Sequence, residues 1–111
     1  MSRSPKEYLK HIQDEIDYLI RSTENLEEEK FSRDETLQKA FVRSLEIIGE
    51  ATKNLPKEFI DSHNEISWRS IAGMRDRLMH GYFGVDYQIV WDVVKNEIPK
   101  LKKQIKEIIH D

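Results

Sequence analysis

The residues best suited to chemistry lie in one short segment, from Arg75 to Gly84. Its sequence, RDRLMHGYFG, brings five polar or ionisable side chains together, and its two glycines allow the backbone to turn. Arginine binds phosphate oxygens through planar donors, and histidine, with an unperturbed pKa of about 6.5, exchanges protons near neutral pH. These side chains suit the cleavage of RNA, because its 2′-hydroxyl already supplies the nucleophile.

The spacing within this segment decides which side chains share a helix face. Asp76 and Arg77 precede His80 by four and three residues, so a regular helix would place both beside it. Arg75 precedes His80 by five residues, and the two would diverge by roughly 140°. They can meet at one substrate only if the helix ends near His80 or if a second copy of the chain completes the site. Gly81 favours the first alternative, and an apolar surplus on the helices favours the second.

Helical periodicity dominates the first half of the chain. A capping box with proline at the first helical position, residues 4–7, predicts a helix that begins at Ser4. A second capping box, residues 32–35, predicts that the next helix begins at Ser32 and ends before Pro56. The acidic run between them, residues 27–30, is expected to be a solvated turn or a helix end.

The second half of the chain predicts one short helix and two long ones. Residues 56–63 suit a short helical turn, and Ser67 predicts the cap of a third main helix that ends near the two glycines. The last helix is expected from Asp86 almost to the end of the chain, with a kink rather than a stop at Pro99. Four aromatic residues of this half are expected to pack in the core or at an interface: Trp68, Phe83, Tyr87 and Trp91.

Composition limits the possible classes of protein. At 111 residues the chain is expected to form a single all-α domain, residues 1–111, arranged as an antiparallel four-helix bundle with an additional short helix. The absence of cysteine excludes disulfides and thiolate metal sites, and the remaining histidines have no matching carboxylates, so no metal and no cofactor is expected. No apolar run approaches the roughly 18 residues of a membrane span, which favours a soluble, cytoplasmic protein.

The charge is unevenly distributed. The net charge of −3 argues against a protein that coats nucleic acid by bulk electrostatics. Residues 1–64 carry 10 Lys/Arg against 14 Asp/Glu, whereas residues 66–85 carry three arginines against Asp76 alone. An RNA-cutting site needs only such a local positive pocket. The five lysines near the C-terminus are expected to form a solvated face that could guide RNA: Lys95, Lys100, Lys102, Lys103 and Lys106.

The pattern Arg75-x4-His80-x-Tyr82 resembles the Arg-x4–6-His signature of HEPN ribonucleases, in the extended form seen in HepT toxins. The likeness continues through WRSIAGM ahead of the motif, GYFGVD behind it and RSLEIIGEA at residues 43–51. The resemblance implies a HEPN-type helical bundle that forms a homodimer and cuts RNA without a metal. Arg75 and His80 are then the catalytic residues.

The resemblance also implies a partner. HepT toxins are paired with minimal nucleotidyltransferase antitoxins of the MntA type, which can adenylylate the motif tyrosine, here Tyr82. Asp76, Arg77 and Tyr82 are expected to support substrate binding, Asp76 by orienting His80 or by neutralising Arg77. Arg69 is expected to be a surface charge. Two alternatives stay open: a non-catalytic HEPN module that binds a nucleotide or substrate beside a nucleotidyltransferase, and a structural helical adaptor.

Overall fold

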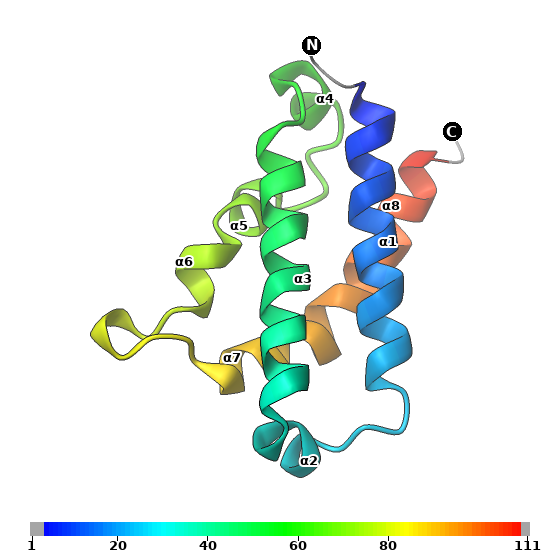
Figure 1. Ribbon diagram of the computed structural model, residues 1–111. Helices are drawn as coiled ribbons and strands as arrows, with labels where there is room; N and C mark the ends of the chain where they lie inside the picture. The colour runs from blue at the N-terminus through cyan, green and yellow to red at the C-terminus, as the bar shows by residue number, and fades with distance from the viewer. Residues whose placement is uncertain (1–3, 110–111) are drawn as a thin grey trace.

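Two long helices, α1 (Pro5–Thr23) and α3 (Glu35–Lys53), pack side by side in the computed structural model, which describes residues 4–109 (Figure 1). A third, broken helix runs back along α3, and a long C-terminal helix packs across α1 and α3. Successive segments run in opposite directions, so the predicted all-α, antiparallel four-helix arrangement is confirmed. Outside one isolated bridge between Met79 and Val85, residues 4–109 contain no strand pairing.

The start of α1 agrees with the prediction. Ser4 occupies the N-cap position and Pro5 the first helical position, although the Ser4 side chain makes no capping hydrogen bond. The apolar stripe of this helix faces the core, since Ile12, Ile16 and Leu19 are buried.

The predicted boundary at Ser32 is wrong by two residues. The acidic run opens a short helix, α2 (Glu28–Arg33), that contains Ser32. The N-cap of α3 is instead Asp34, whose carboxylate accepts a hydrogen bond from the Leu37 N–H at 3.0 Å. Buried Phe31 explains why a helix forms here, because its ring stacks on Phe41 with centroids 5.1 Å apart.

The third main helix is broken where one continuous helix was predicted. After α4 (Lys57–Ser62), which confirms the predicted short turn, come α5 (Trp68–Ala72) and α6 (Met74–Leu78). The break lies at Gly73, whose ψ of 16° interrupts the regular helical geometry. Residues 4–109 contain two additional short helices, α2 and α4, where one was predicted.

The last helix is continuous and contains one π-helical turn. It comprises α7 (Tyr87–Asp92), the π turn η2 (Val93–Glu97) and α8 (Ile98–Ile109). Asp86 caps it by accepting hydrogen bonds from the N–H groups of Gln88 and Ile89. Pro99 has no N–H to donate, and the π turn directly before it accommodates the proline without ending the helix.

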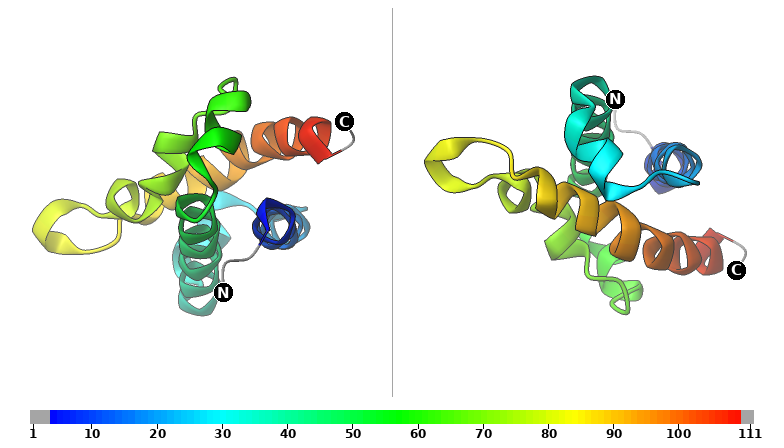
Figure 2. Two further views of the ribbon diagram at one scale, coloured as in Figure 1. Left: turned by 90° about the horizontal axis from the view of Figure 1, so that it is seen from above. Right: turned by 90° about the horizontal axis from the view of Figure 1, so that it is seen from below.

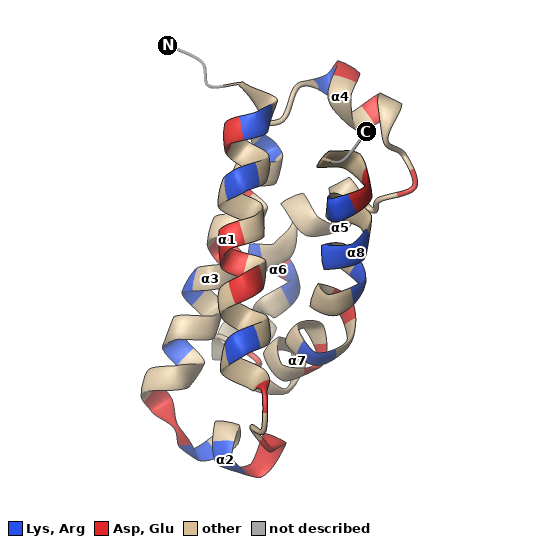
Figure 3. Ribbon diagram, turned by 90° about the vertical axis from the view of Figure 1, so that its right-hand side faces the viewer, with Lys and Arg blue, Asp and Glu red and all other residues tan. Residues whose placement is uncertain are grey.

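The core lies where the four helical segments meet. Trp68 is buried and donates its indole N–H to the His63 carbonyl at 2.9 Å, while Tyr87 and Trp91 are half-buried, so all three pack as predicted. The five C-terminal lysines are exposed, and basic residues recur along α8 (Figure 3). The Lys102 ammonium lies 3.3 Å from the Asp17 carboxylate and joins α8 to α1. No helix within residues 4–109 is long and apolar enough to cross a membrane. The most deeply buried large side chains are Ile12, Ile16, Leu19, Phe31, Phe41, Leu45, Ile48, Met74, Leu78, Val90, Ile98 and Ile105.

Candidate active site

The chain leaves α6 through a tight hairpin, residues 78–86, which extends away from the helical bundle (Figure 2). Two backbone hydrogen bonds tie its arms, from the His80 N–H to the Gly84 carbonyl at 2.6 Å and from the Asp86 N–H to the Leu78 carbonyl at 2.7 Å. Gly81 and Gly84 have φ values of 49° and 92°, a region that L side chains rarely adopt. The two glycines therefore mark the exit of the helix, as the sequence predicts.

The hairpin carries the site's histidine and tyrosine on its surface. His80 is exposed, and Tyr82, in the 3₁₀ turn η1 (Gly81–Phe83), is 96% exposed. Phe83 is 81% exposed, so within this chain it is not the core aromatic that was one of its two predicted roles. Its ring lies 5.8 Å from that of His80. A chain that exposes such aromatic side chains presents a surface suited to a second molecule.

Arg75 does not belong to the hairpin: it lies on the first turn of α6. Its exposed side chain lines a pocket of about 220 Å³ against α3. Within residues 4–109, no hydrogen bond or ion pair engages its guanidinium. The other residues that line the pocket are Arg43, Glu46, Gly49, Glu50, Lys53 and Ala72.

A close approach of helices positions Arg75 over α3. Gly49 is buried on α3, and a Cβ built there would lie 3.1 Å from the Ile71 carbonyl oxygen and 3.3 Å from the Met74 Cβ. Any larger residue at position 49 would push the α5–α6 segment outward. Glycine at this position thus holds the turn that carries Arg75 against the polar face of α3.

Arg77 and Asp76 form no ion pair or side-chain hydrogen bond with each other within residues 4–109. The Arg77 guanidinium forms an ion pair with Glu97 on the π turn, so Glu97, not Asp76, neutralises it. Its other terminal nitrogen, Nη1, is buried without a partner within residues 4–109. This pairing ties α6 to the C-terminal helix. Asp76 is exposed, and its carboxylate makes no hydrogen bond or ion pair in the described part of the chain, so neither contact predicted for it is present.

A sequence model of the family described as Ribonuclease HepT-like matches residues 12–108. The chain belongs to this family. A candidate RNase of Caldanaerobacter subterraneus subsp. tengcongensis is 53% identical over 107 residues, which cover 96% of each chain. A protein of Thermococcus cleftensis named as a probable ribonuclease HepT is 45% identical over 108 residues, covering 97% of this chain and 98% of its own. A candidate RNase of Methanocaldococcus jannaschii is 45% identical over 103 residues, covering 93% and 82% respectively. No solved structure shows a significant match.

In this HepT-like chain the motif is split between a helix and a hairpin. Because α6 ends at Leu78, His80 lies beyond the helix, which fulfils the first of the two conditions set by the spacing. A continued helix would place Tyr82, seven residues after Arg75, close to the Arg75 side chain, but α6 ends before it reaches Tyr82. No hydrogen bond, ion pair or ring contact joins Arg75 to His80 within residues 4–109.

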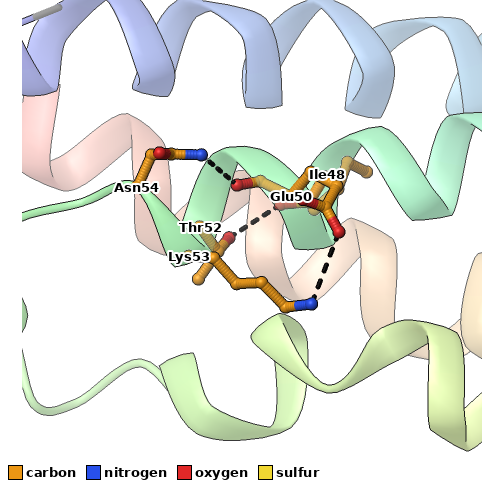
Figure 4. Close-up of polar contacts among 5 residues, drawn as sticks. All are labelled: Ile48, Glu50, Thr52, Lys53 and Asn54. Atoms are coloured by element: carbon orange, nitrogen blue, oxygen red, sulfur yellow. Dashed lines mark hydrogen bonds and ion pairs between the residues drawn. The ribbon is translucent and has the colours of Figure 1, made fainter. Parts of the chain in front are cut away.

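The motif gives no sign of the α3 residues that share a pocket with Arg75. Arg43, Glu46, Glu50 and Lys53 recur at steps of three and four, which places them on one polar stripe of α3. At the C-terminal end of this stripe, the Lys53 ammonium lies 3.4 Å from the Glu50 carboxylate (Figure 4). The spacing was visible in the sequence, but nothing in it showed that this stripe faces Arg75.

Proposed function

We propose that this chain is a metal-independent ribonuclease toxin that cleaves RNA through Arg75 and His80. Membership of the HepT-like ribonuclease family supports the reaction, and relatives that match almost the whole chain are named as ribonucleases. The observation that carries the assignment of residues is their accessibility. Arg75, His80 and Tyr82 are all exposed and none is held in an ion pair, whereas a structural adaptor would be expected to bury or pair such groups.

The chemistry needs only a proton carrier and a charge-stabilising group. The 2′-hydroxyl of RNA attacks the adjacent phosphorus, the bond to the 5′-oxygen breaks, and the products are a 2′,3′-cyclic phosphate and a 5′-hydroxyl. His80 takes the proton from the 2′-hydroxyl or gives one to the leaving oxygen. Arg75 donates hydrogen bonds to the phosphate oxygens as their negative charge grows in the transition state.

A homodimer would complete this site. The Arg75 side chain lines a pocket against α3, whereas His80 lies on the hairpin. A second copy of the chain could therefore add its own Arg75 and His80 to those of the first copy around one phosphate. One His80 would then act as base and the other as acid. The exposed apolar side chains of Met79 and Phe83 support a contact at the hairpin. Sedimentation should show a dimer at micromolar concentration, and a monomer would count against the composite site.

Control of the toxin is proposed at Tyr82. A minimal nucleotidyltransferase antitoxin of the MntA type would place the Tyr82 hydroxyl against the α-phosphorus of ATP. The new oxygen–phosphorus bond forms as pyrophosphate leaves. An AMP group there adds bulk and negative charge where the RNA phosphate must bind. With 96% of its surface exposed, Tyr82 can enter a partner's active site without rearrangement of the core. Tyr82→Phe removes the acceptor hydroxyl, so the antitoxin with ATP should no longer add the mass of AMP to the chain.

The deciding experiment incubates the purified protein with total RNA and with tRNA in EDTA. Intact-mass measurement first establishes that Tyr82 is unmodified. Arg75→Ala and His80→Ala should each lower the rate of cleavage by roughly 10² to 10³-fold, because each removes a group that acts in the transition state. Arg21→Ala, an exposed arginine on α1 outside the pocket, is the matched control. RNA left intact by the unmodified wild type would refute the nuclease and favour the nucleotide-binding module.

A further inference from the structure

A second pocket adjoins the one that Arg75 lines. It has a volume of about 240 Å³ and lies between α3 and the first turns of α1, where Tyr8 and His11 form its far wall. Arg43 and Glu50 line both pockets, so the two are neighbours separated by these side chains. Together they form what we term the α3 groove. Figure 1 shows α3 with α5 and α6 on one side and α1 on the other, so the two pockets flank α3.

Positive charge is available along the α3 groove. Arg43 and Arg75 are exposed and, within residues 4–109, have no ion-pair partner. Two carboxylates also line the groove. The Glu50 carboxylate lies 3.4 Å from Lys53, and its backbone carbonyl accepts a hydrogen bond from the Asn54 side chain (Figure 4). Glu46 has no ion-pair partner within residues 4–109, so Arg43, Lys53 and Arg75 face two carboxylates and leave a net positive charge. Two unpaired guanidinium groups facing one pocket favour a ligand with phosphate oxygens.

The α3 groove is elongated and includes an aromatic side chain. Between Arg43 and Asn54 it follows α3 for roughly 16 Å at the helical rise. At its far end the half-buried Tyr8 ring lies one helical turn from His11. A cationic track that ends in an aromatic side chain is the arrangement on which single-stranded nucleic acid binds, with phosphates on the cations and a base on the ring.

We infer that the α3 groove binds the single-stranded RNA that flanks the cleavage point, with Arg43 as the ligand of a neighbouring phosphate and Tyr8 as a base-stacking surface. The inference rests on the proposed function, because it takes the scissile phosphate to lie at Arg75. It makes Arg43 a binding residue and explains how a chain of net charge −3 can hold RNA through a local site.

The test measures binding without cleavage. A fluorescently labelled single-stranded RNA with 2′-O-methyl groups on every ribose lacks the nucleophile, so its affinity can be measured by anisotropy between about 50 and 200 mM salt. Arg43→Ala should weaken binding about tenfold, as expected for the loss of one charged hydrogen bond. The slope of log affinity against log salt should become shallower by about 0.7, the value for one phosphate contact on a single strand.

Two further variants separate the sources of affinity. Tyr8→Leu should weaken binding about fivefold while the salt slope stays as in the wild type, because stacking releases no counterions. Arg21→Ala removes an equally exposed arginine on α1 that lies outside the groove, and it should change neither quantity. Thermal unfolding of each variant verifies that the fold is retained.

The outcomes for the groove and for the nuclease are distinguishable. If Arg43→Ala binds RNA like Arg21→Ala, the groove is not an RNA site, even when the wild type cleaves RNA. If Arg43→Ala instead changes the sedimentation coefficient from dimer to monomer, the groove is a protein interface and the inference is overturned. If Arg43→Ala weakens RNA binding as expected but the wild type cuts no RNA, the groove is an RNA-binding site and the nuclease proposal fails.

Discussion

Replacing Gly49 with alanine tests whether the close approach of α5 and α6 to α3 is required. The added methyl group would lie 3.1 Å from the Ile71 carbonyl oxygen and 3.3 Å from the Met74 Cβ. Both atoms belong to the backbone or are fixed directly to it, so neither can rotate away as the end of a long side chain can. Relief requires a shift of a few tenths of an ångström in the turn that carries Arg75.

Two opposing contributions set the expected change in stability. Alanine in a helix interior is favoured over glycine by about 1 kcal/mol. Overpacking a tight contact costs about 1–3 kcal/mol, and the two short distances here suggest a value near the middle, about 2 kcal/mol. The free energy of unfolding of Gly49→Ala should therefore fall by about 1 kcal/mol, which corresponds to a decrease in Tm of about 4 °C.

Gly73→Ala provides the matched control because it adds the same methyl group without the clash. Its φ of −86° is accessible to alanine, and the nearest atom, the Arg69 carbonyl oxygen, would lie at 3.4 Å. This variant should gain about 0.4–1 kcal/mol by restricting the unfolded chain. Urea titrations followed by circular dichroism compare the two. Equal stabilisation of both variants would refute the claim that Gly49 marks a tight helix contact.

The rate of RNA cleavage gives a second measurement on Gly49→Ala. Displacing a reacting group by about 1 Å can lower a rate 10²-fold, so a shift of a few tenths of an ångström at Arg75 should lower it by roughly three- to tenfold. Both variants are measured well below their unfolding midpoints, where each is fully folded. An unchanged rate together with the expected loss of stability would mean that the α5–α6 turn can shift without moving Arg75 from its working position.

Four further substitutions, one of them a control, test the fold. Asp34→Ala should lower the free energy of unfolding by about 1 kcal/mol through loss of the α3 cap, whereas Ser32→Ala should change it by less than about 0.5 kcal/mol; the reverse order in urea titrations would reassign the cap. Gly84→Ala forces φ 92° on a residue with a side chain, at a local cost of about 1–3 kcal/mol. Hydrogen exchange at the His80 amide should then become faster while Tm changes little, and undiminished protection would contradict the strain. Phe41→Ala removes a fully buried ring stacked on Phe31, and should cost about 3–5 kcal/mol in chemical unfolding; a loss below about 1.5 kcal/mol would indicate a core loose enough to collapse around the gap.

A helix boundary was predictable where the capping residue and the start of the apolar stripe of the helix indicate the same position. Ser4 with Pro5, and Asp86 ahead of the last helix, agree with the structure because capping and apolar spacing point to the same boundary. At residues 32–35 the capping box predicts Ser32 as the cap, whereas the cap in the structure is Asp34, two residues later. The choice between them depends on Phe31, whose burial against Phe41 and Trp91 holds α2 in place. That long-range contact is absent from local patterns.

The motif residues were predictable, but their arrangement was not. The spacing of Arg75 and His80 showed that a regular helix cannot bring them together, and the position of Gly81 indicated where the helix would end. Partner choice is a tertiary property. Arg77 lies next to Asp76 in sequence, yet it pairs with Glu97, twenty residues away. Similarly, the polar stripe of α3 gains its significance only when α6 packs across it.

The hairpin performs two tasks with one set of backbone hydrogen bonds. The Leu78 carbonyl at the end of α6 accepts from the Asp86 N–H, and the Asp76 carbonyl accepts from the Met79 N–H, so helix-end carbonyls that would otherwise need water are satisfied. The same closure orients the backbone of His80, which donates to the Gly84 carbonyl. Because Tyr82 at its tip is 96% exposed, this side chain can be modified without disturbing helix packing. A reversible block at Tyr82 would therefore act on the site while leaving the stability of the fold unchanged.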